Sequence, residues 1–563
     1  MTDQTAAGGF ISEITFKNRE SITLQQNDIV LIVGPNNSGK SQFLSEIHSL
    51  SRSNPETLII QNLNIEKSQI PIKNILEEIS VKERDADGYF YNGLDFRVFI
   101  NESTEREFYN NDKFGDFTDI FICKLNTSSR LSICDPAPLI NEDVPKSHPI
   151  HYAANSKFYR DWLSGNFKKA FGQNLIPHTF YGSSIPLCIG TPPKTSGGDQ
   201  YLLDNIDKFK EILKNYPKVH LQGDGIKSFT GILLHLMLDY RRIFLIDEPE
   251  AFLHPPQAKI LGKIMGESFN NSQQAFISTH SEAVIQGLLE SCSNRIKIIR
   301  ITREGNINHF SILNHNHLEK LWSDPLLKYS NIMSSLFHKE VVLCESDSDC
   351  KMYSLIENQI KQTKGVYSET LFIHCGGKHR IGKIANALLS LDINVKTIVD
   401  IDVLDDQNIL KSTTEPFDIQ WDTIQKHYKN IYSAIHTQKE KIKRNTAKNH
   451  INRILESTDT PYLTATDIRE ISNELKTESK WSSLKKSGIY AMPAGQASKS
   501  FEQMKEILNN KGIFIVPVGE LENFVKNVGG HGPEWVNRVL DTYPNLDDSV
   551  YDNIKKFISD MNL

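Results

Sequence analysis

A glycine-rich segment near the N-terminus has the residue types and spacing needed to bind the phosphates of a nucleotide. The segment GPNNSGKS, residues 34–41, follows the apolar run DIVLIV and precedes SQFLSEIHSL, whose apolar residues recur at helical spacing. A loop between a strand and a helix lets backbone amides and the positive helix N-terminus surround an anion. We expect Lys40 to reach the β- and γ-phosphates and Ser41 to hold Mg²⁺. The other loop residues predicted to contact the nucleotide are Gly34, Asn36, Asn37, Ser38 and Gly39.

Two further motifs supply the groups that a phosphate-binding loop needs for hydrolysis. Asp247 and Glu248 follow the apolar run IFLI, as carboxylates do at the end of a buried strand. We expect Asp247 to bind the nucleotide's metal through water and Glu248 to polarise the attacking water. His280 follows the apolar run AFIST and is expected to contact the γ-phosphate. Each motif alone also fits a strand end in solvent or a structural histidine, but their order along the chain favours an ATPase site.

A second set of carboxylates follows two apolar runs in the C-terminal half. Glu345 and Asp349 come after VVLC, and Asp400 and Asp402 come after TIV. Parallel strands that end side by side would bring these groups to one edge of a sheet. Such oxygen ligands suit Mg²⁺ or Mn²⁺, which can polarise a phosphodiester and activate water. Either acidic group alone also fits a solubilising turn, but together they favour a paired-metal hydrolase.

The segments around these motifs predict an α/β fold in two domains, 1–335 and 336–563. Between residues 10 and 33 the apolar runs predict two or three strands, and helices are expected around 226–240 and from 257. Residues of about 100–205 have little periodicity and are interpreted as an irregular insertion, which is a candidate dimerisation region. In the second domain, strands are expected at LFIHCGGK, KTIVDIDVL, GIYAMP and GIFIVPVG, and a helical insertion at about 407–486.

The overall composition excludes several classes of protein. The 563 residues are 39% hydrophobic and 23% charged, which is typical of folded domains. No apolar run is long enough to span a membrane, and the N-terminal segment lacks the pattern of a secretory signal, so a cytoplasmic location and no membrane partner are expected. Seven scattered cysteines without CxxC pairs argue against a disulfide framework or structural zinc. The net charge of −6 means that any contact with DNA must come from a local patch.

One candidate for such a patch lies between residues 426 and 448. This segment has six lysines and one arginine against a single acid, with Tyr428 and Tyr432 among them. On a helix these residues would form a positive face able to neutralise nucleic-acid phosphates. The alternative is a charged helix that is only solvated.

The N-terminal motifs resemble those of a known class of ATPases. GPNNSGKS, LIDEPEAFLHP and STHS, in this order, are similar to the Walker A motif, the Walker B motif with its D-loop, and the H-loop of ABC/SMC-type ATPase heads. The resemblance covers roughly residues 10–330 and implies that ATP binds between two associating heads. It places the signature loop in QGDGIKSFTGILLHL, where Gly223, Gly225 and Ser228 are the candidates. This segment departs from the usual LSGGQ.

The C-terminal acidic motifs resemble a Toprim domain, which has a glutamate after one strand and a DxD motif after a later one. An ABC-type ATPase precedes them, HCGGK lies between them and VPVGELENF follows them, so the whole chain resembles the OLD family of ATP-dependent nucleases. The resemblance implies that Glu345, Asp349, Asp400 and Asp402 bind metal. It makes Glu520 or Glu522 the later acid and gives Lys378 the role of holding a phosphate or stabilising developing charge.

Two points of this resemblance are open. Ser346 stands where the family usually has glycine after the first glutamate. The family also has a catalytic lysine near the C-terminus, and the sequence does not identify it. The candidates for that lysine are Lys485, Lys486, Lys499 and Lys526.

The resemblance implies an ATPase and Mg²⁺-dependent endodeoxyribonuclease, with the head domain controlling the Toprim site. Proteins of this layout serve in anti-phage defence, either with a helicase-like partner or as effectors of a retron, with its reverse transcriptase and DNA-linked RNA. The residues expected to act in catalysis are Glu248, His280, Glu345, Lys378, Asp400 and Asp402. The alternatives are a non-cleaving, ATP-driven switch or scaffold that binds nucleic acid, and, ranked last, a transporter ATPase subunit.

Overall fold

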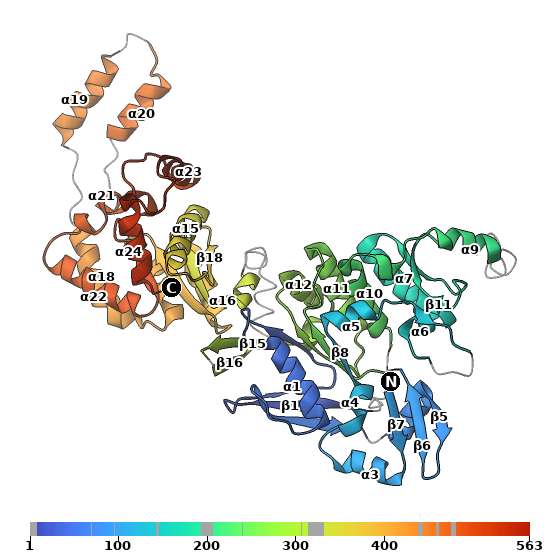
Figure 1. The fold of residues 1–563 in the computed structure, drawn as a ribbon. Helices are drawn as coiled ribbons and strands as arrows, with labels where there is room; N and C mark the ends of the chain where they lie inside the picture. The colour runs from blue at the N-terminus through green and yellow to red at the C-terminus, as the bar shows by residue number, and fades with distance from the viewer. Residues whose placement is uncertain are drawn as a thin grey trace. The chain divides into compact units, whose positions relative to one another are not determined.

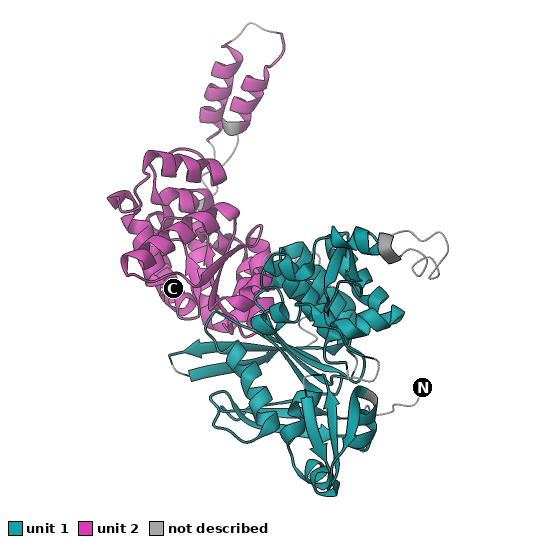
Figure 2. Ribbon diagram, turned by 45° about the vertical axis from the view of Figure 1, so that its right-hand side comes forward, with its two compact units in different colours: residues 1–320 teal, residues 321–563 magenta. Residues whose placement is uncertain are grey.

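The chain folds into two compact units. The computed structural model describes residues 8–68, 70–94, 96–141, 146–192, 206–238, 240–305, 307–313, 332–436, 443–457, 461–474 and 480–562. Unit 1 comprises residues 1–320 and unit 2 residues 321–563 (Figure 2), whereas the sequence placed the boundary at 335. None of the helices in the described parts of the chain has the length and apolar character to cross a membrane.

Unit 1 is built on a six-stranded sheet with the order β16-β15-β3-β14-β13-β8. Figure 1 labels three of its strands, β8, β15 and β16. Its strands are β3 (Ile29–Val33), β8 (Ile122–Leu125), β13 (Ile243–Asp247), β14 (Gln274–Ser278), β15 (Ile296–Glu304) and β16 (Ile307–Leu313). All except β16 run parallel to their neighbours. β3, β13 and β14 are buried along almost their whole length, which explains why they appear in the sequence as unbroken apolar runs.

Helices and smaller sheets surround this central sheet. The helices are α1 (Lys40–Arg52), α2 (Ile72–Ile79), α3 (Glu102–Asn110), α4 (Thr118–Phe121), α5 (Thr127–Ser132), α6 (Pro149–Asn155), α7 (Lys157–Phe171), α9 (Ile206–Lys214), α10 (Asp224–Leu236), α11 (Pro255–Ser268) and α12 (Glu282–Cys292). The smaller sheets contain β1 (Gly9–Phe16), β2 (Ser21–Thr23), β4 (Ile60–Lys67), β5 (Ser80–Arg84), β6 (Tyr89–Gly93), β7 (Phe96–Ile100), β9 (Ala137–Pro138), β10 (Asn174–Pro177), β11 (Ser184–Ile185) and β12 (Leu187–Gly190). The predicted strands between 10 and 33 are therefore β1, β2 and β3.

The region from 100 to 205 is more regular than the sequence indicated. Its described part contains helices α3 to α7, and β8 belongs to the main sheet, where it pairs in parallel with β13. The prediction that an irregular insertion begins at about residue 100 is therefore wrong for β8, which is a strand of the main sheet. The four residues of this strand are too few to show a period against the polar segments around them.

Unit 2 contains a four-stranded parallel sheet with the order β18-β17-β19-β20. Its strands are β17 (Glu340–Cys344), β18 (Thr370–His374), β19 (Asn394–Val399) and β20 (Ile513–Ile515). Its helices are α15 (Asp347–Thr363), α16 (Ile381–Leu389), α17 (Gln407–Thr414), α18 (Trp421–His436), α19 (Arg444–Leu455), α20 (Ala465–Glu474), α21 (Lys480–Ser487), α22 (Gln496–Asn509), α23 (Gly532–Thr542) and α24 (Asp552–Asp560). The fold class predicted from the sequence, α/β in both parts, is confirmed.

Two strand predictions in unit 2 need correction. GIYAMP forms a single turn of 3-10 helix at Gly488–Ala491, because Gly488 has a φ of 63° and turns the chain. The strand expected at 396–404 ends at Val399, and a 3-10 turn follows at Ile401–Asp405. Ile401, Val403 and Leu404 are buried in the second turn, whereas Tyr490 in the first is 86% exposed. Short apolar runs do not distinguish a strand from a turn.

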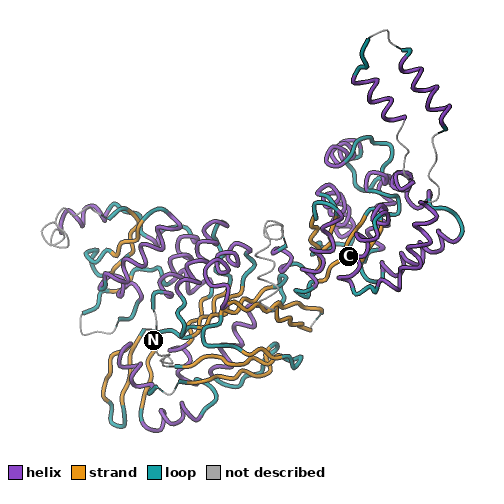
Figure 3. The backbone as a smooth tube through the Cα atoms, turned by 180° about the vertical axis from the view of Figure 1, so that it is seen from behind, coloured by secondary structure: helices purple, strands orange, loops and turns teal. Residues whose placement is uncertain are grey.

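The helical insertion predicted between β19 and β20 is present as α17 to α21. α19 and α20 pack side by side (Figure 3), and no residue of α19 is buried. The basic segment 426–448 falls partly on residues 437–442, which lie outside the described residues. Lys426, Lys429 and Arg444 are exposed, but Tyr428 is only 3% exposed and packs against Trp421 and Tyr432. Tyr428 is therefore part of the core and does not present its ring to a base.

Candidate active sites

The glycines of the first candidate site are required by its geometry. Gly34 follows the buried strand β3 with a φ of 145°, and a Cβ atom there would lie 2.0 Å from the carbonyl oxygen of Ile301. Gly39 precedes α1 with a φ of 98°. Both backbone conformations are strained for any residue with a side chain. The loop therefore wraps tightly between strand and helix, with Asn36 and Asn37 exposed and Ser38 buried.

Lys40 lies inside this loop. Its Nζ donates hydrogen bonds to the carbonyl oxygens of Gly34, at 3.0 Å, and Pro35, at 2.7 Å. Burial lowers the pKa of Lys40 to about 8, against the opposing effect of Glu248 and Asp247. The carbonyl oxygens of Gly34 and Pro35 thus hold the ammonium group at the centre of the loop. A charged phosphate at this place would bind the ammonium group more strongly than the two carbonyl oxygens do.

The predicted partners from β13 and β14 converge on the same place. Asp247 Oδ1 accepts hydrogen bonds from Ser41 Oγ, at 3.1 Å, and from Ser278 Oγ. Ser41 and Asp247 are therefore positioned to share one Mg²⁺. Glu248, with a φ of 47°, has an oxygen 3.7 Å from His280 Nε2. Burial and the charge of Lys40 lower the pKa of His280 to about 4, so its ring is neutral and can either donate or accept a hydrogen bond.

Two residues that the sequence analysis missed hold this arrangement together. Arg130 of α5 is fully buried and donates to the backbone carbonyl oxygens of Asp247, at 2.5 Å, and Glu248, at 3.1 Å. Glu250 accepts the backbone N–H of His280, at 2.7 Å. Glu250 could have been suspected from its place in DEPE, but no local pattern marks Arg130, which is distant in sequence from the carboxylates.

Replacing Arg130 by alanine is expected to destabilise unit 1 by about 3 kcal/mol, because it removes a charged hydrogen-bond donor from the carbonyl oxygens of Asp247 and Glu248 and creates a cavity. Chemical denaturation followed by circular dichroism measures this change in the free energy of unfolding. Arg52→Ala is the matched control, since that arginine is 48% exposed and pairs with Asp119 at the surface. The control should change stability by less than about 1 kcal/mol. Equal effects of the two substitutions would contradict the positioning role of Arg130.

The candidate signature loop lies at the start of α10. Gly223 is exposed there, and a Cβ atom on Gly225 would lie 2.6 Å from the carbonyl oxygen of Phe252. Ser228 is fully buried, so in this conformation its hydroxyl cannot reach a nucleotide on another head. Gly223 and Asp224 are the members of this segment that are open to solvent.

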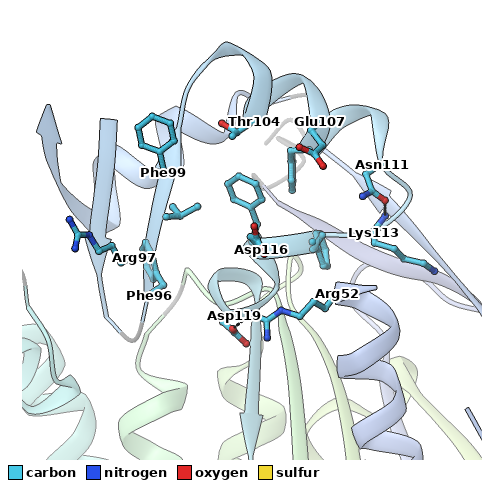
Figure 4. A pocket seen from close by; sticks show the side chains of 15 residues that line it. Arg52, Phe96, Arg97, Phe99, Thr104, Glu107, Asn111, Lys113, Asp116 and Asp119 are labelled. Atoms are coloured by element: carbon cyan, nitrogen blue, oxygen red, sulfur yellow. Dashed lines mark hydrogen bonds and ion pairs between the residues drawn. The ribbon is translucent and has the colours of Figure 1, made fainter. Parts of the chain in front are cut away.

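A cleft elsewhere in unit 1 is separate from these motifs. Its volume is 590 Å³, and it lies among β7, α3 and the segment that follows α3 (Figure 4). Arg52 pairs with Asp119 at 2.8 Å, and Lys113 donates to the carbonyl oxygen of Leu63 at 2.6 Å. These charges therefore already have partners within the protein.

The second candidate site lies at the carboxyl end of the sheet in unit 2. Glu345 follows β17 and Asp400 follows the neighbouring strand β19, as the sequence predicted. Ligand atoms of Glu345, Asp400 and Asp402 all lie within 4.8 Å of one another. Glu345 Oε1 also accepts the backbone N–H of Asp400 at 3.2 Å.

The electrostatics of this cluster fit a divalent cation. Burial and the charge of Asp402 raise the pKa of Glu345 to about 7, and burial and Glu345 raise that of Asp400 well above its usual range. The carboxylates therefore repel one another in a poorly solvated place, and a cation among them would relieve that repulsion. The oxygen donor set is the one that Mg²⁺ and Mn²⁺ prefer.

Two lysines contact the cluster. Lys378 Nζ lies 3.0 Å from Asp402 Oδ1. Lys485 of α21 lies 3.4 Å from Asp402, 3.6 Å from Asp400 and 3.4 Å from Glu520. Burial alone would lower the pKa of Lys485, but the three carboxylates raise it. Of the four C-terminal lysines considered, Lys485 is the one that the structure brings to the carboxylates.

A glycine makes the approach of Lys485 possible. Gly519, with a φ of 104°, would place a Cβ atom 2.1 Å from the carbonyl oxygen of Lys485. Its own carbonyl oxygen accepts the backbone N–H of Ile401, next to Asp400. The backbone at residue 519 thus lies between the lysine and the aspartates, with no room for a side chain.

Asp349 and Ser346 have a structural role at the start of α15. Ser346 Oγ accepts the N–H of Asp349 at 3.2 Å, and Asp349 Oδ2 accepts the N–H of Ser346 at 2.8 Å. This capping box accounts for a serine at the position where the resemblance led us to expect glycine. Burial raises the pKa of Asp349, but its carboxylate lies outside the group of Glu345, Asp400 and Asp402.

A second group of possible ligands lies beside the first. Glu520, Glu522 and His531 have ligand atoms within 4.8 Å of one another. His531 Nδ1 lies 2.6 Å from Glu522 Oε1, which also accepts the N–H of Gly532 at 2.8 Å. Lys485 connects the two groups through Glu520. Both later acids are thus near the cluster, and His531 is a neighbour that the sequence did not indicate.

Comparison with known proteins finds similarity to an ATPase family and to a nuclease. Residues 191–285 match the AAA ATPase domain family, so this segment is similar to an ATPase domain. The Old nuclease of Escherichia phage P2 is 25% identical over 174 residues, which are 30% of this chain and 28% of that protein. The resemblance to OLD-type nucleases is confirmed.

Solved structures of SMC head domains also match. The SMC head bound to the C-terminal winged-helix domain of ScpA has 12% identity and a TM-score of 0.33, and the match covers 55% of this chain and 99% of that one. The SMC head domain from Thermotoga maritima has 14% identity and a TM-score of 0.30, with 54% and 99% covered.

Proposed function

We propose that this chain is an ATP-hydrolysing, metal-dependent DNA endonuclease whose ATPase domain controls a Toprim-type phosphodiesterase site. The observation that carries the proposal is the meeting of Glu345, Asp400 and Asp402 with Lys378 and Lys485 at one edge of a parallel sheet. Residues 191–285 of the same chain are similar to an ATPase domain. The similarity to the Old nuclease supports this combination of activities.

The residues have separate roles in the proposed cleavage. Glu345, Asp400 and Asp402 would hold Mg²⁺ or Mn²⁺, with Glu520 and Glu522 beside them and Asp349 held at the start of α15. The bound metal would supply a Lewis acid that polarises the scissile phosphate and activates water. Lys378 and Lys485 would stabilise the negative charge that develops on the phosphate oxygens.

The ATPase site would act through the groups around the phosphate loop. Lys40 and the loop amides would bind the phosphates, and Ser41 and Asp247 would hold Mg²⁺. Glu248 would orient the attacking water, and the neutral His280 would contact the γ-phosphate. Self-association of the ATPase domains, with ATP between two copies, is part of the proposal.

The biological setting that we propose is anti-phage defence. DNA is the substrate, and the partner is either a retron reverse transcriptase with its DNA-linked RNA or a helicase-like protein. The OLD-type resemblance supports this setting. A non-cleaving, ATP-driven switch that binds nucleic acid is the alternative.

Plasmid cleavage by the native chain and by Lys485→Met tests the proposed nuclease. With Mg²⁺ or Mn²⁺, and with and without ATP, we expect cutting of supercoiled or single-stranded DNA that EDTA abolishes. Loss of the Lys485 charge should lower the cleavage rate by about a hundredfold. The adjacent, exposed Lys486 provides the control Lys486→Met, which should cut at nearly the native rate. Native cleavage that Lys485→Met leaves unchanged would refute the role of this lysine, and no metal-dependent cutting under any condition would favour the switch.

A further inference from the structure

Helix α19 of unit 2 has a polar face that neither candidate site uses. The helix spans Arg444–Leu455 and contains no acidic residue and no buried residue. It packs against α20, which lies beside it in Figure 1. Ala447, Ile451 and Ile454 are half-buried and recur at helical spacing, so they form the side of α19 that meets α20. The other side of the helix is exposed to solvent.

The exposed side carries a row of amides between cations. Three asparagines at intervals of four and three residues lie on one face of the helix. These asparagines, all exposed, are Asn445, Asn449 and Asn452. Because a helix has about 3.6 residues per turn, Arg444 and Lys448 lie along one edge of the amide row and Arg453 along the other. All three cations are exposed.

This face weakens the helix that carries it. Lys443 and Arg444 stand at the N-terminus of α19, where the helix dipole disfavours cations. Arg444 and Lys448 are like charges one turn apart, which repel each other. Asparagine also has a low propensity for the middle of a helix. Within the described parts of the chain, no carboxylate pairs with Arg444, Lys448 or Arg453. A ligand that binds this face accounts for these residues better than solvation does.

The dimensions and chemistry of the face fit the major groove of DNA. The helix has 12 residues and is therefore about 18 Å long, and the groove, about 12 Å wide, admits one α-helix. An asparagine amide can both donate to and accept from the groove edge of adenine. The cations on either side of the amide row would contact the phosphates that border the groove.

Other nucleic acids fit this face less well. The major groove of double-stranded RNA is too deep and narrow for side chains to read. Proteins that hold single strands stack the bases on aromatic rings, and the exposed side of α19 consists of asparagine, lysine and arginine without such a ring. The face therefore favours double-stranded DNA.

We propose that α19 is a recognition helix, which enters the major groove of double-stranded DNA and reads adenines through Asn445, Asn449 and Asn452. The inference rests on the proposed function in one respect, since DNA is the substrate proposed for the nuclease. It adds to that function a preference for particular sequences. The cations supply a local positive surface on a chain whose net charge is −6.

Selection from a library of random DNA duplexes by the full-length chain tests the reading of sequence. EDTA is present, so that metal-dependent cutting does not remove the bound DNA. We expect enrichment of a motif that contains adenines. Fluorescence anisotropy should then show binding of the enriched duplex about tenfold or more tighter than of a scrambled one.

Two variants separate the roles of the amides and the cations. Asn445→Ala/Asn449→Ala/Asn452→Ala should lose the preference for the enriched duplex but keep its affinity for the scrambled one. Alanine favours helix, so this variant should retain its fold. Arg444→Gln/Arg453→Gln should weaken binding of both duplexes and lower the slope of log affinity against log salt concentration by about two.

The matched control for the cations is Lys364→Gln/Lys511→Gln. It removes two exposed lysines outside α19 and should bind both duplexes as the native chain does. An equal loss of affinity in this control would contradict a special role of α19. Tighter binding of a duplex RNA, lost in the arginine variant, would assign the face to RNA and overturn the proposal.

Plasmid cleavage with Mg²⁺, measured in parallel, separates this inference from the proposed nuclease. A native chain that cuts DNA but enriches no sequence, with unchanged binding by the asparagine variant, would overturn the recognition helix and leave the nuclease standing. A native chain that enriches a sequence through the asparagines but cuts no DNA would support the recognition helix and count against the nuclease.

Discussion

Asp400→Asn is expected to lower metal-dependent DNA cleavage by at least about a thousandfold. Asparagine has nearly the same shape but removes one of the three charges that would hold the metal. The cluster depends on that charge, since Asp400 lies between Glu345, which accepts its N–H, and Lys485, 3.6 Å from its carboxylate. Plasmid cutting measures the rate, and calorimetric titration with Mn²⁺ measures metal binding, which should weaken in parallel.

Asp347→Asn is the matched control for this substitution. Asp347 belongs to the same acidic segment as Glu345, but it is exposed and pairs with Lys351 at 2.8 Å. Its removal should leave cleavage within about twofold of the native rate, because surface ion pairs contribute little. ATP hydrolysis should be unchanged in both variants. Undiminished cleavage by Asp400→Asn would rule out the Toprim-type site.

Lys40→Ala is expected to lower ATP hydrolysis by about a thousandfold. The substitution removes the one ammonium group at the centre of the phosphate loop, and no nearby basic residue of the loop can replace it. Phosphate release at saturating ATP measures the effect. Lys17→Ala, which changes an exposed lysine after β1, should hydrolyse ATP as the native chain does. Hydrolysis that survives in Lys40→Ala would show that nucleotide binds elsewhere.

The same variant reports the direction of control between the two activities. If ATP hydrolysis licenses cleavage, Lys40→Ala should cut DNA slowly with or without ATP. If ATP restrains cleavage, the variant should cut at a rate that ATP no longer lowers. Either result links the phosphate loop to the carboxylate cluster, whereas a native response to ATP would show that the activities are independent.

The parts of the sites that could be predicted from sequence are those fixed by local geometry. The phosphate loop lies between a strand and a helix that adjoin it in sequence, and Glu345 and Asp400 each end a strand of strong apolar character. Lys485 and Arg130 could not be predicted in this way. Lys485 is 83 residues from Asp402 along the chain, and Arg130 is 117 residues from Asp247. The helices that carry Lys485 and Arg130 have no distinctive sequence pattern.

Errors in the predicted fold have a similar origin. The apolar residues of GIYAMP suit a strand, and only the left-handed conformation of Gly488 makes the segment a turn. Tyr428 lies in a basic segment that was a candidate for contacting nucleic acid, but Ile424, Tyr428 and Ile431 are all on the buried face of α18. Tertiary packing decided both cases, and a single sequence records it only weakly.

The close approach at Gly519 offers a way to recognise related proteins in genomes. The position of Lys485 depends on Gly519, because the backbone of Lys485 packs against residue 519 so closely that a side chain there would collide with it. Related chains that retain the site should therefore carry a glycine one residue before the later acid and a lysine on the preceding helical insertion, however much that insertion varies in length. A search pattern built on this pair would find homologues that searches based on the ATPase motifs alone cannot distinguish from other P-loop proteins.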